Sequence, residues 1–378
     1  KEFMINQNYK INSNYAVLIL SILSFIYIFI TNNYFSIEES FIFGGGDGYS
    51  YLEIAKSSPY ITEVSLQPIH TERFVVPYLI GFINKLILVD NYIIFRFLTI
   101  FCLLTINYYL IKILFLCNLS LVNILFSILL INLNPYITRF YIANPLIIND
   151  LVFHIGVLLC VFSFFEKKKK YFFLGLIISI IARQSAVAIL LSIIFLNVIK
   201  KGKSFYNKKD IFFSFIIILF IYLLGYLYSS NTLQDDTRYN QYYTTVFGIF
   251  LENKSFNELL LFFIWPFLSF GPLILYLFLY LKSEKIKTEK NTDLNYFILF
   301  FSALIILQPI LQGLEVSGRN IIRLSNFAFI PLLILAQINF VNIKKNILIK
   351  NIFFIIILFI WSSHPTYSIF SFLENYKF

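Results

Sequence analysis

Charged residues are scarce in this chain, and their scarcity excludes a soluble fold. Only 13% of its 378 residues are Asp, Glu, Lys or Arg, whereas 59% are hydrophobic and the mean hydropathy is +0.78. A soluble domain carries about 25% charged residues because its surface faces water. A larger buried core would not account for so few charged residues, so the sequence predicts a protein that is embedded in lipid.

Cysteine is rare as well, and no polar stretch is long enough to enclose a separate soluble core. The net charge is +10, but the lysines occur in short clusters between apolar runs. This placement is typical of the orientation signal of a membrane protein, and we do not expect nucleic acid as a partner. The cysteines lie inside apolar runs without metal-type spacing, so we interpret them as small core residues: Cys102, Cys117 and Cys160.

Apolar runs long enough to cross a bilayer as a helix recur along the whole sequence. Together with two shorter runs that form a hairpin around Arg183, they predict an all-α polytopic membrane protein with about 11 transmembrane helices. The predicted spans are 15–33, 92–116, 118–136, 150–165, 171–183, 185–199, 209–228, 259–281, 293–312, 320–340 and 347–362.

The segment from Phe74 to Val89 is apolar but short, and Pro77 and Lys85 interrupt it. If it lies along the membrane surface, every lysine cluster falls on one side, so we predict a surface helix rather than a span. The N-terminus is then cytoplasmic, the loop 34–91 is on the outer side, and a bacterial inner membrane is the expected location. No cleavable signal peptide is evident, since the first apolar run is long enough to remain as an anchor.

Arginine is distributed differently from lysine, because all arginines fall on the outer side in this topology. Orientation requires only positive charge, so the arginines are expected to have a second use. Guanidinium groups bind phosphate or carboxylate with two parallel hydrogen bonds and tolerate partial burial. For any single arginine, the alternative is that it pairs with a local acid or snorkels to the interface. The arginines are Arg73, Arg96, Arg139, Arg183, Arg238, Arg319 and Arg323.

The outer loop contains the glycine-rich run 44–48, which lets the chain turn just outside the membrane. We predict that Asp47 lies near the start of a short helix in which Tyr51, Leu52 and Ala55 face lipid. A carboxylate at that position gains from the helix dipole and stays ionised, so it can act as a base or hold a metal. A plain helix cap is the alternative.

The order of these features resembles the GT-C superfamily of glycosyltransferases, which use lipid-linked sugar donors. The shared features are an outer-loop aspartate after the first span (Asp47), a surface helix with a proline near its start (Pro77) and an arginine that opens the second span (Arg96). The outer junction that carries Arg139 and the hairpin with the basic tip Arg183 continue the likeness. The layout looks most like the dolichyl-phosphate mannosyltransferase and lipid A aminoarabinose transferase branch.

The resemblance implies that Asp47 is the catalytic base that deprotonates an acceptor hydroxyl. It implies that Asp150 is a second acidic residue that orients the substrate or the first carboxylate, and that Arg183 faces the donor phosphate in place of the usual lysine. The chain departs from the branch in having Asp47-Gly48 where Asp-Glu is frequent, and in having one proline instead of two in the surface helix. It divides into a cytoplasmic N-terminus with a cloning remnant before Met4 (1–14), a GT-C-like module (15–200) and a variable transmembrane module with outer loop 229–258 (201–378).

Further substrate contacts are predicted on the same side. Arg319 and Arg323 are four residues apart and share a helical face, so they could grip a lipid phosphate together with Arg139; a Glu315–Arg319 pair is the alternative. The polar aromatic stretch around Tyr239 suits sugar rings, or forms an ordinary interfacial belt. His154, one turn past Asp150 on the same face, is interpreted as a satisfied core histidine, with contact to the site as the alternative. The predicted acceptor or sugar contacts are Tyr51, His70, Arg73 and Tyr239.

These features favour a membrane glycosyltransferase that moves a sugar from a polyprenyl-phosphate-type lipid donor to an acceptor on the outer face, with Asp47 as general base. The acceptor would be a lipid-linked glycan, a lipid or a protein. Two alternatives stay open: an O-antigen or capsule polymerase or ligase that uses outer-face arginines, and a transporter or flippase of a lipid-linked sugar. A divalent Mg²⁺ or Mn²⁺ ion is left open as a cofactor, with Asp47 as its ligand.

Overall fold

The computed structural model describes residues 47–119, 121–232, 269–274, 292–317 and 320–340, with isolated positions at 19, 22, 26, 260, 264, 266 and 277. Every regular element in these residues is a helix, which confirms the all-α prediction. Within them, five helices are long and apolar enough to cross a membrane: Asn91–Leu116, Pro145–Glu166, Lys208–Ser230, Thr292–Gln312 and Ile321–Ile338. The predicted spans 15–33 and 347–362, and most of 259–281, lie outside the described residues.

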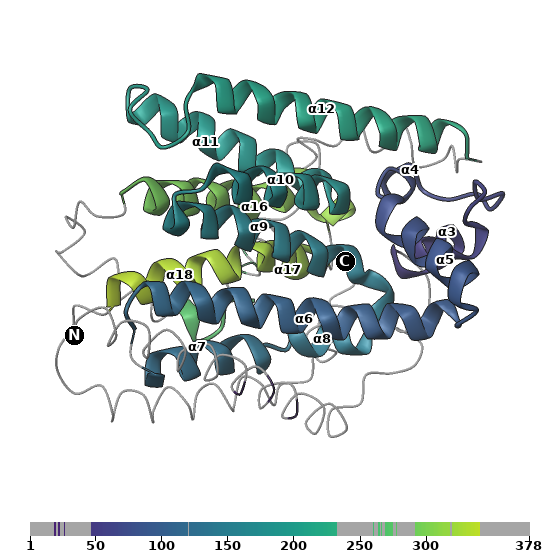
Figure 1. Ribbon diagram of the computed structural model, residues 1–378, viewed down its shortest axis with the longest axis horizontal. Coiled ribbons are helices and arrows are strands. Elements are labelled where there is room, and N and C mark those ends of the chain that lie inside the picture. Colours follow the sequence, from purple (N-terminus) through teal and green to yellow (C-terminus); the bar gives the residue numbers. More distant parts are fainter. Residues whose placement is uncertain are drawn as a thin grey trace, which may run out of the picture.

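The longer helices run side by side along the long axis of the bundle (Figure 1). Helices α9 and α10 pack on each other most closely, α6 packs on α9, and α11 packs on α16 and α12. These helices are α6 (Asn91–Leu116), α9 (Ile148–Glu166), α10 (Lys169–Ala182), α11 (Val187–Ile199), α12 (Lys208–Ser230), α16 (Thr292–Ser317) and α18 (Phe329–Phe340).

Short helices connect the long ones. They are α7 (Leu121–Asn132), α8 (Thr138–Ala143), η1 (Pro145–Ile147), η2 (Gln184–Ala186), α17 (Asn320–Ser325) and η5 (Asn326–Ala328). The predicted span 118–136 is therefore helical only over part of its length, whereas the predicted span 209–228 differs from α12 by no more than two residues at either end.

Three helices from the segment that was predicted to be the first outer loop gather at one end of the bundle, on the right in Figure 1: α3 (Asp47–Ser57), α4 (Pro68–Thr71) and α5 (Val75–Ile87). Helix α5 has 13 residues and is about 20 Å long, too short to cross a hydrocarbon core of about 30 Å. Leu79, Phe82 and Leu86 are exposed along it while Ile80 is buried. This one-sided burial supports the predicted surface helix.

Two lysine-rich turns, at 167–170 and 200–209, lie at the opposite end of the bundle from these helices. At the C-terminal end of α12, the Thr71 hydroxyl lies 2.7 Å from the Ser229 hydroxyl, which ties α12 to α4. At its other end, Lys169 Nζ lies 2.6 Å from Asp210 Oδ2. Because α12 has 23 residues and is about 35 Å long, the two groups of loops are separated by roughly the thickness of a membrane.

Helix α12 exposes apolar side chains around most of its circumference. Phe212 and Phe220 are each 61% exposed, and Phe213, Phe215 and Leu227 are exposed by more than half. Monomeric soluble proteins rarely expose a contiguous apolar surface of this extent. The exposure therefore agrees with a helix that faces lipid.

Two glycines set the close contact between α9 and α10. A Cβ atom on Gly175 would lie 2.5 Å from the Gly156 carbonyl oxygen and 2.8 Å from the Cys160 backbone nitrogen. Small residues at such crossings let two helix backbones approach in a membrane. We expect Gly175→Leu to force the helices apart and to destabilise the fold by about 1–3 kcal/mol, measured as unfolding in lipid nanodiscs. Leu174→Ala, at the exposed neighbouring position, is the control and should unfold like the parent protein.

Candidate functional site

Five of the residues predicted to carry chemistry lie in one charged cluster where α3 and α4 meet the bundle. The cluster contains Asp47 on α3, His70 on α4, Asp150 on α9, Arg183 after α10 and Arg323 on α17. The side chains of Asp150, Arg183 and His70 are 0%, 4% and 5% exposed. Five segments of the chain therefore place two carboxylates, two guanidinium groups and an imidazole in a buried space.

Asp47 is the first residue of α3, and an imidazole and a guanidinium group contact its two carboxylate oxygens. His70 Nε2 lies 2.8 Å from Oδ1, and Arg323 Nη2 donates a hydrogen bond of 2.6 Å to Oδ2. Burial alone raises the pKa of the Asp47 carboxyl, but the charges of Arg323, His70 and Arg73 outweigh burial and hold that pKa well below its ordinary value of 3.8. Asp47 is therefore ionised in the structure.

The low pKa of Asp47 predicts an acid-sensitive contribution to stability. A carboxyl whose pKa is depressed on folding adds stability above its unfolded pKa, and that contribution is lost as the pH falls through the folded pKa. We expect Asp47→Asn to be less stable than the parent protein from pH 5 to 7 and the difference to shrink below about pH 4. Unfolding in nanodiscs across this pH range measures the effect, and a difference that grows with acid would contradict it.

Asp150 is the deeper carboxylate of the cluster and has three partners. Arg183 Nη1 donates to Oδ1, the Tyr141 hydroxyl donates to Oδ2 at 3.1 Å, and Arg323 Nε lies 3.4 Å from Oδ2. Arg323 thus stands between the two carboxylates and contacts both. The Arg183 guanidinium also lies over the Phe327 ring at 4.9 Å, which adds a cation–π contact.

His70 on α4 bridges Asp47 and two other residues of α3. Its Nδ1 atom lies 2.9 Å from the hydroxyl of Ser50, which follows Asp47 by one helical turn. The imidazole ring also packs edge-on against Tyr51. With both ring nitrogens engaged, the imidazole has a fixed orientation. It therefore positions the carboxylate of Asp47.

Arg73 lies beside the cluster in a second hydrogen-bond chain. Its Nε atom donates to Gln184 Oε1 at 2.5 Å, and Gln184 Nε2 donates to Glu72 Oε2 at 2.9 Å. The Asn149 amide donates to the Arg73 carbonyl oxygen at 3.1 Å. Gln184 follows Arg183 and Asn149 precedes Asp150 in the sequence. These hydrogen bonds therefore fix the backbone segments that carry the charged cluster.

One prediction about side chains is wrong and another is confirmed only in part. Tyr51 and Ala55 were expected to face lipid, but they are buried against the core because α3 packs on α5 and η1. His154 was interpreted as a satisfied core histidine; it is buried, yet neither ring nitrogen has a hydrogen-bond partner in the described part of the chain. Its ring instead lies edge-on to Tyr141 and Phe327.

Three other predicted contacts lie outside what the structure describes. Arg319 and Tyr239 fall in undescribed segments, and of Arg139 only the backbone, in α8, is described. Their predicted roles stay predictions.

Several polar atoms at the cluster have no hydrogen-bond partner within the described residues. They are Nε of Arg183, Nε of Arg323 and the hydroxyl of Tyr51. Buried donors are almost always paired in native proteins, so unused donors indicate where water or a ligand binds. Nε of Arg183 therefore remains a free donor for an anion, whereas Nε of Arg323 already lies 3.4 Å from Asp150 Oδ2.

The described residues do not provide a metal site. Among them, no group of three or more His, Cys, Asp or Glu side chains could hold a metal ion. At Asp47, the predicted ligand, both oxygens already contact cationic or imidazole nitrogens. The Mg²⁺ or Mn²⁺ ion left open by the sequence thus has no suitable ligand set in this part of the chain.

Sequence reasoning missed the partners that orient the cluster. Ser50 could have been found, because it lies three residues after Asp47 and so on the same helical face. Tyr141 and Gln184 carry no signal of their own, since their contacts with Asp150 and Glu72 depend on tertiary packing.

Comparisons of the chain with protein-family models, with curated proteins and with solved structures found no match. Inferences about function therefore come from the residues and from the geometry of the cluster.

Proposed function

We propose that the protein is a membrane glycosyltransferase that transfers a sugar from a polyprenyl-phosphate-type donor to an acceptor hydroxyl. The observation that carries the proposal is the shared position of Arg323 between Asp47 and Asp150. Transfer from a lipid phosphate requires a carboxylate near the acceptor and cations at the departing phosphate. The cluster supplies both within one buried site.

The ion pairs of the cluster suggest how a donor would activate Asp47. The donor phosphodiester carries one negative charge, as a carboxylate does, but it matches the fork of a guanidinium group and gains further charge as the bond to the sugar breaks. When the donor phosphate binds Arg323 and Arg183, it competes with Asp47 and Asp150 for them. Asp47 then loses its strongest cationic neighbour while staying buried, so its pKa rises and the carboxylate becomes a better base.

The transfer step is a single displacement at the anomeric carbon of the donor sugar. The acceptor oxygen forms the new bond to that carbon as the bond from the carbon to the phosphate oxygen breaks. Asp47 takes the acceptor proton, and the polyprenyl phosphate leaves with the electron pair, stabilised by Arg183 and Arg323. His70 holds Asp47 in place throughout.

The positions of the lysine-rich turns indicate which side of the membrane the site would face. The charged cluster lies at the end of the bundle opposite to the turns that contain Lys167–Lys170 and Lys200–Lys209. Lysine-rich turns mark the cytoplasmic side. The site would then face the outer side of a bacterial inner membrane, where both the lipid-linked donor and a lipid-linked glycan, lipid or protein acceptor are within reach.

The proposal is tested with purified protein in liposomes that contain a radiolabelled polyprenyl-phosphate sugar. A panel of donor sugars is combined with an extract of cell-envelope lipids and glycans as the acceptor. We expect release of polyprenyl phosphate and a labelled product that depends on the extract. Donor that crosses the bilayer without being consumed would indicate a flippase, and the transferase proposal would then be wrong.

A further inference from the structure

A basic surface covers the end of the bundle that carries the lysine-rich turns. Three acids at this end each pair with one lysine: Glu166 with Lys168 at 2.9 Å, Asp210 with Lys169 at 2.6 Å and Asp293 with Lys200 at 3.2 Å. Six further lysines are exposed and have no acidic partner in the described part of the chain. They are Lys167, Lys170, Lys201, Lys203, Lys208 and Lys209. This end of the bundle therefore presents a surplus of positive charge.

The ion pair between Lys169 and Asp210 joins the first turn of α10 to the first turn of α12. The two helices begin at the same end of the bundle and pack on each other. Their exposed lysines, Lys170 on α10 and Lys208 and Lys209 on α12, therefore lie on neighbouring turns at one level of the molecule.

Each of these three lysines is followed four positions later by an exposed apolar side chain. Side chains four residues apart share a helical face. Leu174 follows Lys170 and is 48% exposed, while Phe212 and Phe213 follow Lys208 and Lys209 and are 61% and 56% exposed. Both helices thus place a charge at the end of the bundle and an apolar surface directly beyond it, on the same face.

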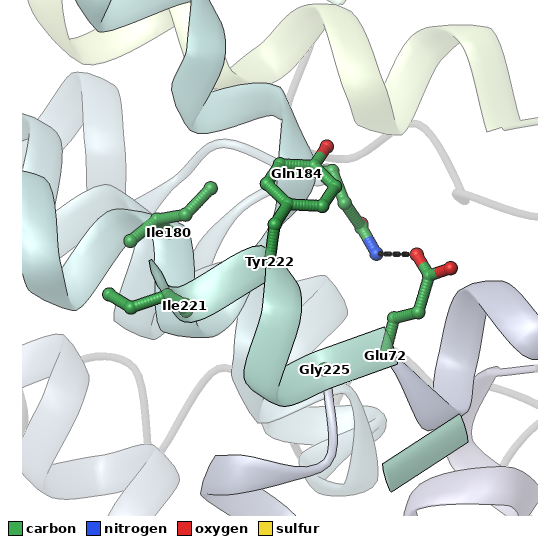
Figure 2. A pocket seen from close by; sticks show the side chains of 6 residues that line it. All are labelled: Glu72, Ile180, Gln184, Ile221, Tyr222 and Gly225. Atoms are coloured by element: carbon green, nitrogen blue, oxygen red, sulfur yellow. Dashed lines mark hydrogen bonds between the residues drawn. The ribbon is translucent and has the colours of Figure 1, made fainter. Parts of the chain in front are cut away.

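Helix α12 is held against the bundle at its other end as well. There a Cβ atom on Gly225 would lie 2.7 Å from the Glu72 carbonyl oxygen, so the backbones of α12 and of the residue after α4 are in contact. Figure 2 shows the side chain of Glu72 beside this contact, joined by a hydrogen bond of 2.9 Å to Gln184. Contacts at both ends fix which side of α12 faces outward, so its exposed phenylalanines belong to a fixed outer surface.

The combination of charge and apolar surface defines the chemistry of the partner. A lysine near a membrane surface attracts anionic headgroups, and each one strengthens binding about fivefold. Exposed phenylalanine and leucine side chains suit acyl chains. A soluble acidic protein would match the charges alone, and a neutral lipid would match the apolar surface alone. An anionic phospholipid matches both.

We propose that the first turns of α10 and α12 bind an anionic phospholipid. Its headgroup phosphate lies at Lys170, Lys208 and Lys209, and its acyl chains lie on the exposed apolar side chains that follow them. The site is at the opposite end of the bundle from the charged cluster, and it does not depend on the proposed sugar transfer.

The test uses the full-length protein in phosphatidylcholine nanodiscs that contain a trace of photoreactive phosphatidylglycerol, with a diazirine close to the ester end of one acyl chain. Photoreactive phosphatidylcholine with the same chain is the reference. We expect phosphatidylglycerol to label Phe212 and Phe213, located by mass spectrometry, at least about tenfold more than the reference, because two or three lysines contribute about fivefold each.

Lys208→Gln with Lys209→Gln should lower this ratio about tenfold, since both side chains are exposed and their loss removes only the charge. The matched control is Lys56→Gln with Lys85→Gln, which removes two exposed lysines at the other end of the bundle. This control should label Phe212 and Phe213 like the parent protein.

A second measurement uses only the parent protein. Raising NaCl from about 0.1 M to 1 M shortens the Debye length from about 10 Å to about 3 Å, so the preference for phosphatidylglycerol should fall severalfold. A ratio near one in the parent protein, a ratio that 1 M salt leaves unchanged, or an equal loss in the control variant would overturn the proposal. Binding of soluble polyglutamate to the protein in neutral nanodiscs, together with a ratio near one, would assign the lysines to an acidic protein instead.

Discussion

Asp47→Asn should lower the rate of the proposed sugar transfer by about 100- to 10,000-fold, the amount that a positioned general base contributes, if Asp47 is the base. Asparagine has nearly the shape of aspartate, but its amide cannot take up the acceptor proton. Radiolabelled product formed from a polyprenyl-phosphate sugar in liposomes measures the effect.

The proposed mechanism also predicts how Asp47→Asn changes kcat and the KM for the donor. Asp47 competes with the donor phosphate for Arg323 in the proposed mechanism, so removing its charge should not weaken donor binding. We therefore expect kcat to fall while KM for the donor stays equal or falls. A loss that appears only as a higher donor KM would mean that Asp47 acts in binding.

Glu53→Gln is the control for this experiment. Glu53 is an acidic residue of the same helix, and its carboxylate pairs with Lys56 at 2.7 Å, away from the cluster. The Glu53→Gln variant should transfer sugar at the same rate as the parent protein. If Asp47→Asn also retained near-full activity, an O-antigen or capsule polymerase that relies on arginines alone would be the better hypothesis.

Much of the helical architecture could be predicted from the sequence, because apolar runs and their polar ends follow directly from the need to satisfy backbone groups in lipid. The run 92–116 corresponds to α6, and α5 was expected not to span because its apolar run is short and interrupted by Pro77 and Lys85. The error over Tyr51 and Ala55 has a related cause. A short amphipathic helix at the membrane surface can bury its apolar face in lipid or in protein, and periodicity alone does not distinguish the two.

The charged cluster could be predicted only in part. Asp47, Asp150 and Arg183 were expected on one membrane face because the lysine clusters set the direction in which the apolar runs cross the membrane. The contact of Arg323 with Asp47 joins residues that are 276 positions apart and depends on how α17 packs against α3. The sequence pattern of a single segment carries no information on such pairing, so the shared guanidinium between two carboxylates became visible only in the structure.

The second large effect is expected at the buried pair of Asp150 and Arg183. Asp150→Asn should destabilise the protein by about 3–5 kcal/mol, because the Arg183 guanidinium would stay buried without the charge that offsets its desolvation. Arg183→Met should cost less, since Asp150 keeps Arg323 within 3.4 Å. Unfolding in nanodiscs measures both.

The double variant separates the structural role of this pair from its role in transfer. With both charges removed, the desolvation penalty disappears, so Asp150→Asn with Arg183→Met should be more stable than Asp150→Asn alone. If Arg183 also stabilises the departing phosphate, the double variant should fold yet transfer sugar at least about 100-fold more slowly than the parent protein, as expected when a preorganised charge at the developing anion is lost. Parental activity in a stable double variant would show that the pair only supports the fold, and the donor phosphate would then have to bind at Arg323 without Arg183.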